Sequence, residues 1–255
     1  MALELLTIPC RADNYAYLVK GPGDDEVALI DAPDAGPIIA ALDARGWNLG
    51  AILITHHHHD HVAGVEELRA RYAAKVVGPA AEADRLPPLD RALSGGDTGG
   101  EGPFRSVVID VPGHTIGHIA YHFPEAGLAF TADSLMAGGC GRLFEGTPAQ
   151  MWNSLCKLAA LPPETLICSG HEYTAANLRF AATLEPGNQE LISRIERVTA
   201  ARREGRFTVP SRLSEELATN PFLRAGLPQM KAALGMNKAD DVTVFAEIRA
   251  RKDNF

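Results

Sequence analysis

The sequence of 255 residues predicts an α/β protein that ends in a helical segment. Over about the first 170 residues, short apolar runs alternate with helical patterns, as layered α/β folds require. From Glu172 onward, apolar residues recur at helical spacing instead. In addition, several apolar runs end just before histidine or aspartate. Side chains that follow neighbouring strands gather at one rim of a sheet, so the same pattern predicts a site there.

The predicted strands are short apolar or alternating runs bounded by turn residues. In chain order they are Leu3–Ile8, Tyr15–Val19, Glu26–Ile30, Ala51–Ile54, Lys75–Val77, Arg105–Val111, Ile119–Phe123, Leu128–Thr131 and Thr165–Cys168. This part, residues 1–171, is expected to be the catalytic domain.

Residues 172–255 are expected to form a helical, substrate-binding domain. Pro186-Gly187 separates a first helix from a second, and Thr208–Ser211 is expected to be a loop before a short helix from Ser214. A last helix runs from Asp240-Asp241 to Lys252. Its acidic start and basic end suit the helix dipole.

Composition limits the classes of function. The formal net charge of -8 argues against a broad nucleic-acid-binding surface. No apolar stretch approaches the roughly 20 residues of a membrane span, and no signal peptide is recognisable. The four cysteines have no C-x-x-C spacing, which is typical of reduced thiols in a cytoplasmic protein. We therefore expect no nucleic-acid partner, no membrane partner and a monomeric chain.

The most informative segment is Thr55-His56-His57-His58-His59-Asp60-His61, which holds five of the nine histidines and follows an apolar strand. Imidazole and carboxylate are usual ligands of zinc, iron and manganese. In an extended turn, residues two apart point the same way. His56 and His58 are thus expected at one ion and Asp60 and His61 at a second. The rings of His57 and His59 should point away.

Further ligands must come from elsewhere, and three candidates follow apolar strands in glycine-containing turns: His114, Asp133 and His171. The predicted sets are His56, His58 and His114 for one ion and Asp60, His61 and His171 for the other. Asp133 is expected to bridge them. Metal coordination lowers the pKa of water from about 15.7 to about 7. The sequence thus predicts a binuclear hydrolase using a bridging hydroxide, with Asp60 and Asp133 as catalytic carboxylates.

With these residues in view, the chain resembles the metallo-β-lactamase superfamily and, within it, the glyoxalase II (hydroxyacylglutathione hydrolase) family. The superfamily motif is Thr55-His56-x-His58-x-Asp60-His61 with His114, Asp133 and His171. The narrower family signals are Asp13-Asn14-Tyr15, Gly139-Cys140-Gly141-Arg142, Gly170-His171-Glu172-Tyr173, Asn220-Pro221-Phe222 and Arg249-x-x-Lys252. The resemblance implies an αββα sandwich with a C-terminal helical domain.

The resemblance also implies hydrolysis of S-D-lactoylglutathione to D-lactate and glutathione, as in methylglyoxal detoxification, with two divalent ions per chain. Zinc is expected, with iron and manganese as alternatives. It assigns Arg142, Phe144 and Tyr173 to the glutathione half of the substrate. Arg249 and Lys252, three apart on the last helix, can hold a carboxylate. Phe144 stands where some members carry tyrosine, so a hydroxyl contact is lost or replaced there.

Other interpretations stay open. A persulfide dioxygenase-like mononuclear iron oxidoreductase shares His56, His58, His114 and Asp133 but normally lacks the helical tail. A lactonase or β-lactamase-like hydrolase would not need Arg249 and Lys252, and a nuclease or a non-catalytic binder fits the charge and ligand set less well. The roles of His118 and Cys140 are not fixed by the sequence. His118 is expected to support the site or pack in the core, and Cys140 to pack in a tight turn.

Overall fold

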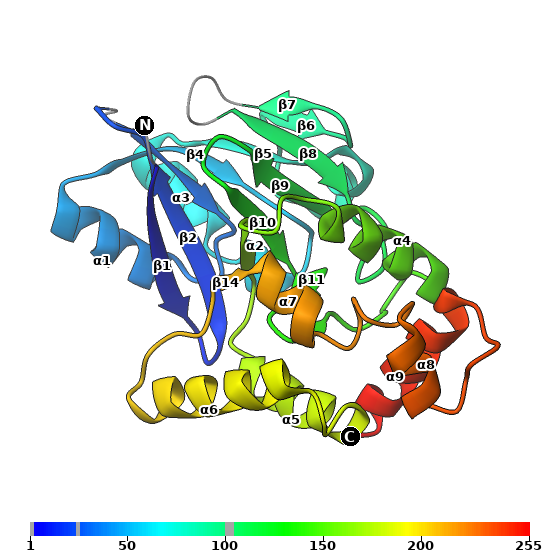
Figure 1. The fold of residues 1–255 in the computed structure, drawn as a ribbon. Coiled ribbons are helices and arrows are strands. Elements are labelled where there is room, and N and C mark those ends of the chain that lie inside the picture. The colour runs from blue at the N-terminus through cyan, green and yellow to red at the C-terminus, as the bar shows by residue number, and fades with distance from the viewer. Residues whose placement is uncertain (1–2, 24–25, 100–104) are drawn as a thin grey trace. The chain divides into compact units, whose positions relative to one another are not determined.

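The computed structural model of the chain describes residues 3–23, 26–99 and 105–255 (Figure 1). The chain forms two compact units, residues 1–110 with 117–130 and residues 111–116 with 131–255. This division falls inside the strand Leu128–Ala132 (β10), and the expected domain boundary at residues 171 and 172 stays a prediction. Within the described residues, no helix has both the length and the apolar character that crossing a membrane demands.

The first unit contains a six-stranded sheet whose strands follow chain order. They are β1 (Glu4–Cys10), β2 (Asn14–Lys20), β3 (Glu26–Ile30), β4 (Asn48–Leu53), β5 (Lys75–Pro79) and β6 (Arg91–Leu93). The first three strands pair antiparallel, and β3 to β6 pair parallel. In the β3–β4 register Ile30 lies opposite Leu53. The residues that follow these strands, Asp31 and Thr55, therefore meet at the carboxyl edge of the sheet.

Short helices connect these parallel strands. They are α1 (Ala35–Arg45), α2 (His59–Val62), α3 (Val65–Tyr72) and the 3-10 helix η1 (Ala80–Arg85). Helix α1 begins after Asp34, whose side chain accepts a hydrogen bond from the backbone of Gly36 at 3.1 Å. Ile38 and Leu68 from these helices belong to a buried apolar cluster that also contains Ile52 of the sheet. Burial of this face holds the helices against the sheet.

A second six-stranded sheet has the order β14-β13-β10-β9-β8-β7. Its strands are β7 (Thr98–Gly99), β8 (Ser106–Asp110), β9 (Ile119–Phe123), β10, β13 (Leu166–Ser169) and β14 (Ser211–Arg212). Within the first unit, strands of the two sheets touch. The ring of Tyr17 lies 5.5 Å from that of Phe130, and the hydroxyl of Tyr121 donates to the carbonyl of Ile54 at 2.8 Å. Mixed sheets, covering helices and a helical C-terminal region confirm the predicted fold class.

The second unit carries the helical part of the chain. Its helices are α4 (Pro148–Ala159), α5 (Thr174–Leu184), α6 (Gln189–Arg203), α7 (Leu213–Thr219), α8 (Pro228–Ala233) and α9 (Asp241–Asp253), and it includes a hairpin of β11 (Leu135–Met136) and β12 (Gly139–Cys140). Thr147 and Gln150 form a reciprocal capping box at the start of α4. Asp240 caps α9 by accepting from the backbone of Thr243 at 3.0 Å. Figure 1 shows α5 and α6 as an antiparallel pair.

The predicted elements agree with the structure wherever a run is long. All of the predicted strands are present, with ends displaced by up to three residues. The break at Pro186-Gly187 separates α5 from α6, and the last helix begins beside Asp240 as predicted. The short strands β6, β7, β11, β12 and β14 and helix α8 were missed. Strands of two or three residues are too short to show alternation.

Candidate metal and substrate site

The histidine run adopts two conformations in succession. Thr55 to His58 form an extended segment after β4, and α2 begins at His59. Nε2 of His56 lies 3.1 Å from Nδ1 of His58, so the two rings converge. Asp60 and His61 lie on a helical turn, which corrects the extended geometry expected for the whole run. They still share a side of the segment, since Oδ2 of Asp60 lies 3.9 Å from Nε2 of His61.

Asp31, at the end of β3, fixes two of these rings. Its carboxylate accepts the Thr55 backbone N–H at 2.8 Å and the Thr55 hydroxyl at 2.9 Å, and it lies 2.8 Å from Nδ1 of His61. A carboxylate only accepts, so Nδ1 of His61 carries the proton and Nε2 keeps the lone pair. Because the Thr55 hydroxyl donates to Asp31, its oxygen accepts from Nδ1 of His56, 3.0 Å away. Both rings thus present Nε2 as a ligand atom.

Asp31 was missed as a site residue because the sequence around it was interpreted as an ordinary loop. It is 3% exposed and has a backbone φ of 55°. A positive φ is uncommon outside glycine, asparagine and aspartate, so the position suits few side chains. A buried aspartate directly after a strand is the signal that could have identified it.

Glu82 of η1 organises the neighbouring residues. One carboxylate oxygen accepts the backbone N–H of His57 at 2.7 Å and lies 2.8 Å from its Nδ1, and the other accepts Gly117 N–H at 3.0 Å. The His57 ring is therefore directed to Glu82, as the alternation predicts. The buried ring of His118 stacks on His56 with centroids 4.6 Å apart. This contact supports the packing role expected for His118.

Asn14 at the start of β2 holds the loop that carries Asp60. Its Nδ2 donates to the Asp60 backbone carbonyl at 3.1 Å and to Asp60 Oδ2 at 3.0 Å. Asn14 belongs to the N-terminal Asp13-Asn14-Tyr15 motif. The contact gives that motif a role in orienting a candidate ligand.

In the second unit, Asp133 lies between two histidines. Its Oδ2 is 3.3 Å from Nε2 of His114 and 3.3 Å from Nε2 of His171. Nδ1 of His114 donates to the carbonyl of Arg142 at 2.8 Å, which leaves the lone pair of the neutral ring on Nε2. The residue before Asp133, Ala132, has a φ of 41° and turns the chain sharply at the end of β10. The three side chains are buried.

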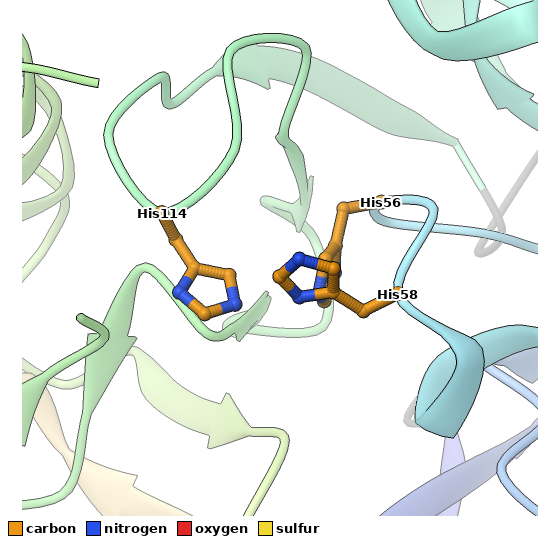
Figure 2. A group of neighbouring side chains, drawn as sticks. All are labelled: His56, His58 and His114. Carbon is orange, nitrogen blue, oxygen red and sulfur yellow. The ribbon is translucent and has the colours of Figure 1, made fainter. Parts of the chain in front are cut away.

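The side chains that the sequence grouped also form spatial groups. Figure 2 shows the rings of His56, His58 and His114 pointing toward one another. In each group the candidate ligand atoms lie within 4.8 Å of one another, and the groups are His56, His58 and His114; His56, His61 and Asp133; Asp60, His61 and His171. Two of these are the predicted sets, and the third links them. Neutral imidazole nitrogens with carboxylate oxygens suit a divalent metal ion.

Two exposed aromatic rings flank the histidines of the second unit. The ring of Phe144 is 5.2 Å from that of His114, and the residue is 61% exposed. The ring of Tyr173 stacks on that of His171, with the ring centroids 4.8 Å apart and an angle of 7° between the ring planes. Exposed aromatic residues beside buried polar groups offer apolar contact area to a bound ligand.

Arg249 of α9 is a buried cation. It is 6% exposed, donates to the Cys140 carbonyl at 3.0 Å and pairs with Asp253 at 2.8 Å. Its guanidinium also lies 5.0 Å from the ring centroid of Phe222. The cation is buried because a carbonyl, a carboxylate and an aromatic face surround it. It therefore supports the chain around Cys140 in addition to any role toward a substrate.

Lys252 lies in a positively charged environment. Burial lowers the pKa of its ammonium group, and the neighbouring charges of Arg249, Arg179 and Arg142 lower it further. Its Nζ lies 5.3 Å from the Phe180 ring centroid. Such a concentration of positive charge favours an anion. Arg179 was missed by the sequence interpretation.

The thiol of Cys140 is not poised to attack. Burial raises its pKa to about 11, although the nearby Arg249 acts in the opposite direction. A thiol is a weak nucleophile compared with its thiolate, so Cys140 is unreactive at neutral pH. This agrees with the expectation of a residue packed in a tight turn.

Comparisons with known proteins separate the chain into two matched regions. Residues 12–171 match the metallo-beta-lactamase superfamily and residues 172–255 match the hydroxyacylglutathione hydrolase C-terminus. Hydroxyacylglutathione hydrolases from Cereibacter sphaeroides and Fuscovulum blasticum are each 64% identical over the full length of both chains. The one from Jannaschia sp. is 62% identical and covers 99% of this chain and 98% of the relative.

Solved structures show the same fold. ETHE1 from Myxococcus xanthus has a TM-score of 0.66 at 24% identity, covering 99% of this chain and 98% of that one. The BLEG-1 B3 metallo-beta-lactamase also has a TM-score of 0.66, at 23% identity, over 86% and 99%. TTHA1623 in a di-iron-bound form has a TM-score of 0.57 at 29% identity, over 66% and 91%.

Proposed function

The chain belongs to the hydroxyacylglutathione hydrolase (glyoxalase II) family of the metallo-β-lactamase superfamily, and from this premise we propose how its residues perform the reaction. The enzyme hydrolyses glutathione thioesters to a 2-hydroxy acid and glutathione. The preferred substrate that we propose is S-D-lactoylglutathione. The observation that carries the proposal is the arrangement of imidazoles whose Nδ1 atoms are occupied by oxygen partners, so that Nε2 is presented.

The residues fit a pair of divalent ions, and we propose zinc, with iron or manganese as alternatives. His56, His58 and His114 would hold one ion, Asp60, His61 and His171 the other, and Asp133 would contact both. TTHA1623, whose structure is in a di-iron-bound form, shares the fold. Divalent ions in such sites lower the pKa of water and polarise a carbonyl group, which is the chemistry thioester hydrolysis needs.

The protein's own contribution is orientation. Asp31 and the Arg142 carbonyl keep protons on the Nδ1 atoms of His61 and His114. Asn14 orients the Asp60 carboxylate, and Asp133 lies between His114 and His171. Partners of this kind fix the tautomer and the angle of a ligand ring. We propose Asp60 and Asp133 as the catalytic carboxylates.

We assign the glutathione half of the substrate to residues of the second unit. Lys252 and Arg142 are the cations proposed to attract its carboxylates, with Arg249 behind them. Phe144 and Tyr173 offer ring faces beside His114 and His171. Phe144 provides no hydroxyl group, so its contact is apolar. In this assignment residues 172–255 form the substrate-binding part and residues 1–171 the catalytic part.

The same proposal covers the setting of the enzyme. Cys10, Cys140, Cys156 and Cys168 are free thiols, which suits the reducing cytoplasm. We also propose that the enzyme is a monomer. A mononuclear iron oxidoreductase acting on a glutathione adduct is the rival. It is disfavoured because the helical region matches the hydrolase C-terminus.

One experiment tests both the reaction and the metal assignment. Metal-replete enzyme is assayed against S-D-lactoylglutathione and a β-lactam while bound metals per chain are counted. We expect thioester hydrolysis, no β-lactam cleavage and two ions. Asp133→Asn should lower turnover by at least about 10³-fold and reduce the number of bound ions. The reason is that the amide nitrogen has no lone pair available for binding a metal ion. One iron per chain and oxidation of a glutathione persulfide would support the rival instead.

A further inference from the structure

The hairpin β11–β12 is held by the side chains of residues far along the chain. Nδ2 of Asn220 donates to the carbonyls of Met136 at 3.1 Å and Gly139 at 2.9 Å. Nδ2 of Asn177 donates to the carbonyl of Ala137 at 3.0 Å. Both asparagines are buried. Three carbonyl groups around the hairpin turn, those of Met136, Ala137 and Gly139, are therefore bound by two side chains.

Two charged side chains also bind the backbone of the hairpin. Oε2 of Glu216 accepts the backbone N–H of Gly138 at 2.7 Å, and Nη1 of Arg249 donates to the carbonyl of Cys140 at 3.0 Å. Each residue from Met136 to Cys140 thus has a backbone atom bound by a side chain of α5, α7, α9 or the residue after α7. Hydrogen bonds to charged groups contribute more to stability than hydrogen bonds between neutral groups.

The turn also has no room to move toward α5. Gly138 has a φ of 68°, and a Cβ placed there would lie 2.8 Å from the Leu178 side chain. A Cβ on Gly139 would lie 2.6 Å from Asn177. Only glycine allows the backbone to approach so closely. The sequence Gly138-Gly139 is thus explained by contact with the helix.

Glu216 is the centre of the network. It is fully buried, and besides Gly138 it accepts hydrogen bonds from Asn220 at 3.1 Å and Ser211 at 2.7 Å and forms an ion pair with Arg194. Burial would lower the pKa of the Arg194 guanidinium, but Glu216 holds it above its ordinary value. A buried ion pair gains little net stability over apolar packing. Its placement against the hairpin suggests a positioning role.

The hairpin leads directly into the candidate site. Gly141 N–H donates to the carbonyl of Ser134 at 3.2 Å, and a Cβ on Gly141 would collide with the Asp133 carbonyl. The next carbonyl, that of Arg142, accepts from Nδ1 of His114. A displacement of the hairpin would therefore move the atom that orients the His114 ring. It would also move the side chain of Arg142.

We propose that Asn220 and Glu216 are positioning residues that transmit the packing of the C-terminal helices, through the 136–140 hairpin, to His114 and Arg142. The proposal rests on the proposed function for its kinetic consequences. It assigns a task to Asn220 of the Asn220-Pro221-Phe222 motif, whose side-chain amide binds the hairpin and Glu216. The helical segment then sets the geometry of the site as well as supplying cations.

The test compares Asn220→Ala with Asn188→Ala. Asn188 is the control because its Nδ2 also donates to a carbonyl in the same unit, that of Ala218 at 3.0 Å, and its Oδ1 caps α6, so that its bonds do not go to the hairpin. For each folded variant we measure zinc affinity by chelator competition, amide hydrogen exchange over residues 134–142, and KM and kcat for the thioester. Asn220→Ala should speed exchange in this segment and weaken zinc binding, each by about tenfold or more. It should raise KM, whereas Asn188→Ala should change each of these values less than twofold.

Equal effects of the two variants, seen only as lowered thermal stability, would overturn the proposal. If Asn220→Ala does not fold, Asn177→Ala is measured in its place, since alanine is favourable within α5. Unchanged exchange and zinc affinity in that variant would equally overturn it. If the parent enzyme does not cleave the thioester, the proposed function fails. The exchange and zinc measurements still decide the role of the hairpin.

Discussion

At the scale of single residues, the orientation of the imidazoles depends on oxygen atoms that are not themselves candidate ligands. Asp31 lies against both Thr55 and His61, and Glu82 holds both His57 and Gly117. The ligand candidates could be predicted because they cluster in short motifs at strand ends. Asp31 was marked only by its place directly after a strand, and its partner Thr55 lies 24 positions away. Glu82 could not be predicted, since it is a single acidic residue whose partners lie 25 and 35 positions away.

The first prediction concerns Asp31. Asp31→Asn retains the size of the side chain and tolerates the positive φ. The amide has only one acceptor oxygen, so its NH2 group must face either the Thr55 backbone N–H or the Thr55 hydroxyl and His61 Nδ1. We expect zinc affinity to fall about 10–100-fold while the fold is retained. Chelator competition measures the affinity, and far-UV circular dichroism checks the fold. An unchanged zinc affinity would show that Asp31 does not orient the candidate ligands.

His57 supplies the opposite prediction. Its ring contacts Glu82 and points away from the ligand set, and its backbone N–H keeps a separate bond to the same carboxylate. We expect His57→Ala to leave metal content and kcat nearly unchanged. It should lower the free energy of unfolding by about 1 kcal/mol, the net value of one hydrogen bond. Urea denaturation and metal analysis check both values. A large loss of bound metal would show that the His57 ring belongs to the ligand set.

At the scale of elements, helix α9 brings positive charge to the second unit, but its two cations differ. Arg249 is buried and holds the Cys140 carbonyl, whereas Lys252 keeps part of its surface exposed. Their spacing of three residues predicted a shared helix face. It could not predict which side chain would be covered, because that depends on the hairpin, which comes from residues more than a hundred positions earlier.

Lys252 leads to a prediction about pH. Its pKa is lowered by burial and by neighbouring cations, so its charge is present below that lowered value and is lost as pH rises through it. If the ammonium group binds a carboxylate of glutathione, KM should rise in the alkaline range before an ordinary lysine would titrate. Lys252→Arg, which stays protonated, should keep KM constant over the same range. Steady-state assays from pH 7 to 10 compare the two. Identical profiles would leave Lys252 without a binding role.

The length of an element also decides what the sequence reveals. Strands of five or more residues, such as β2 and β9, were predicted within a few residues of their observed ends. The hairpin of β11 and β12 has two residues in each strand, and only its partners in the helices define its position. Its function in the site is thus a property of tertiary packing and not of local pattern.

At the scale of the whole molecule, the candidate ligands are divided between the two units. The first unit supplies His56, His58, Asp60 and His61, and the second supplies His114, Asp133 and His171. The matched family regions account for the order of these motifs along the chain. The sequence predicted the fold class correctly, and the residues that it grouped as candidate ligands lie close together in the structure. The arrangement of residues that support the ligands required the structure.

The central claim, that metal ions held by these residues carry the hydrolysis, is tested most directly by zinc titration of metal-free enzyme. Thioester turnover, bound zinc and the thermal unfolding midpoint are followed together. We expect no turnover without metal and a turnover that rises with added zinc until two ions are bound per chain. The thermal unfolding midpoint should rise as well, because ligands that bind the native state stabilise it. Full turnover by enzyme shown to contain no metal would contradict it.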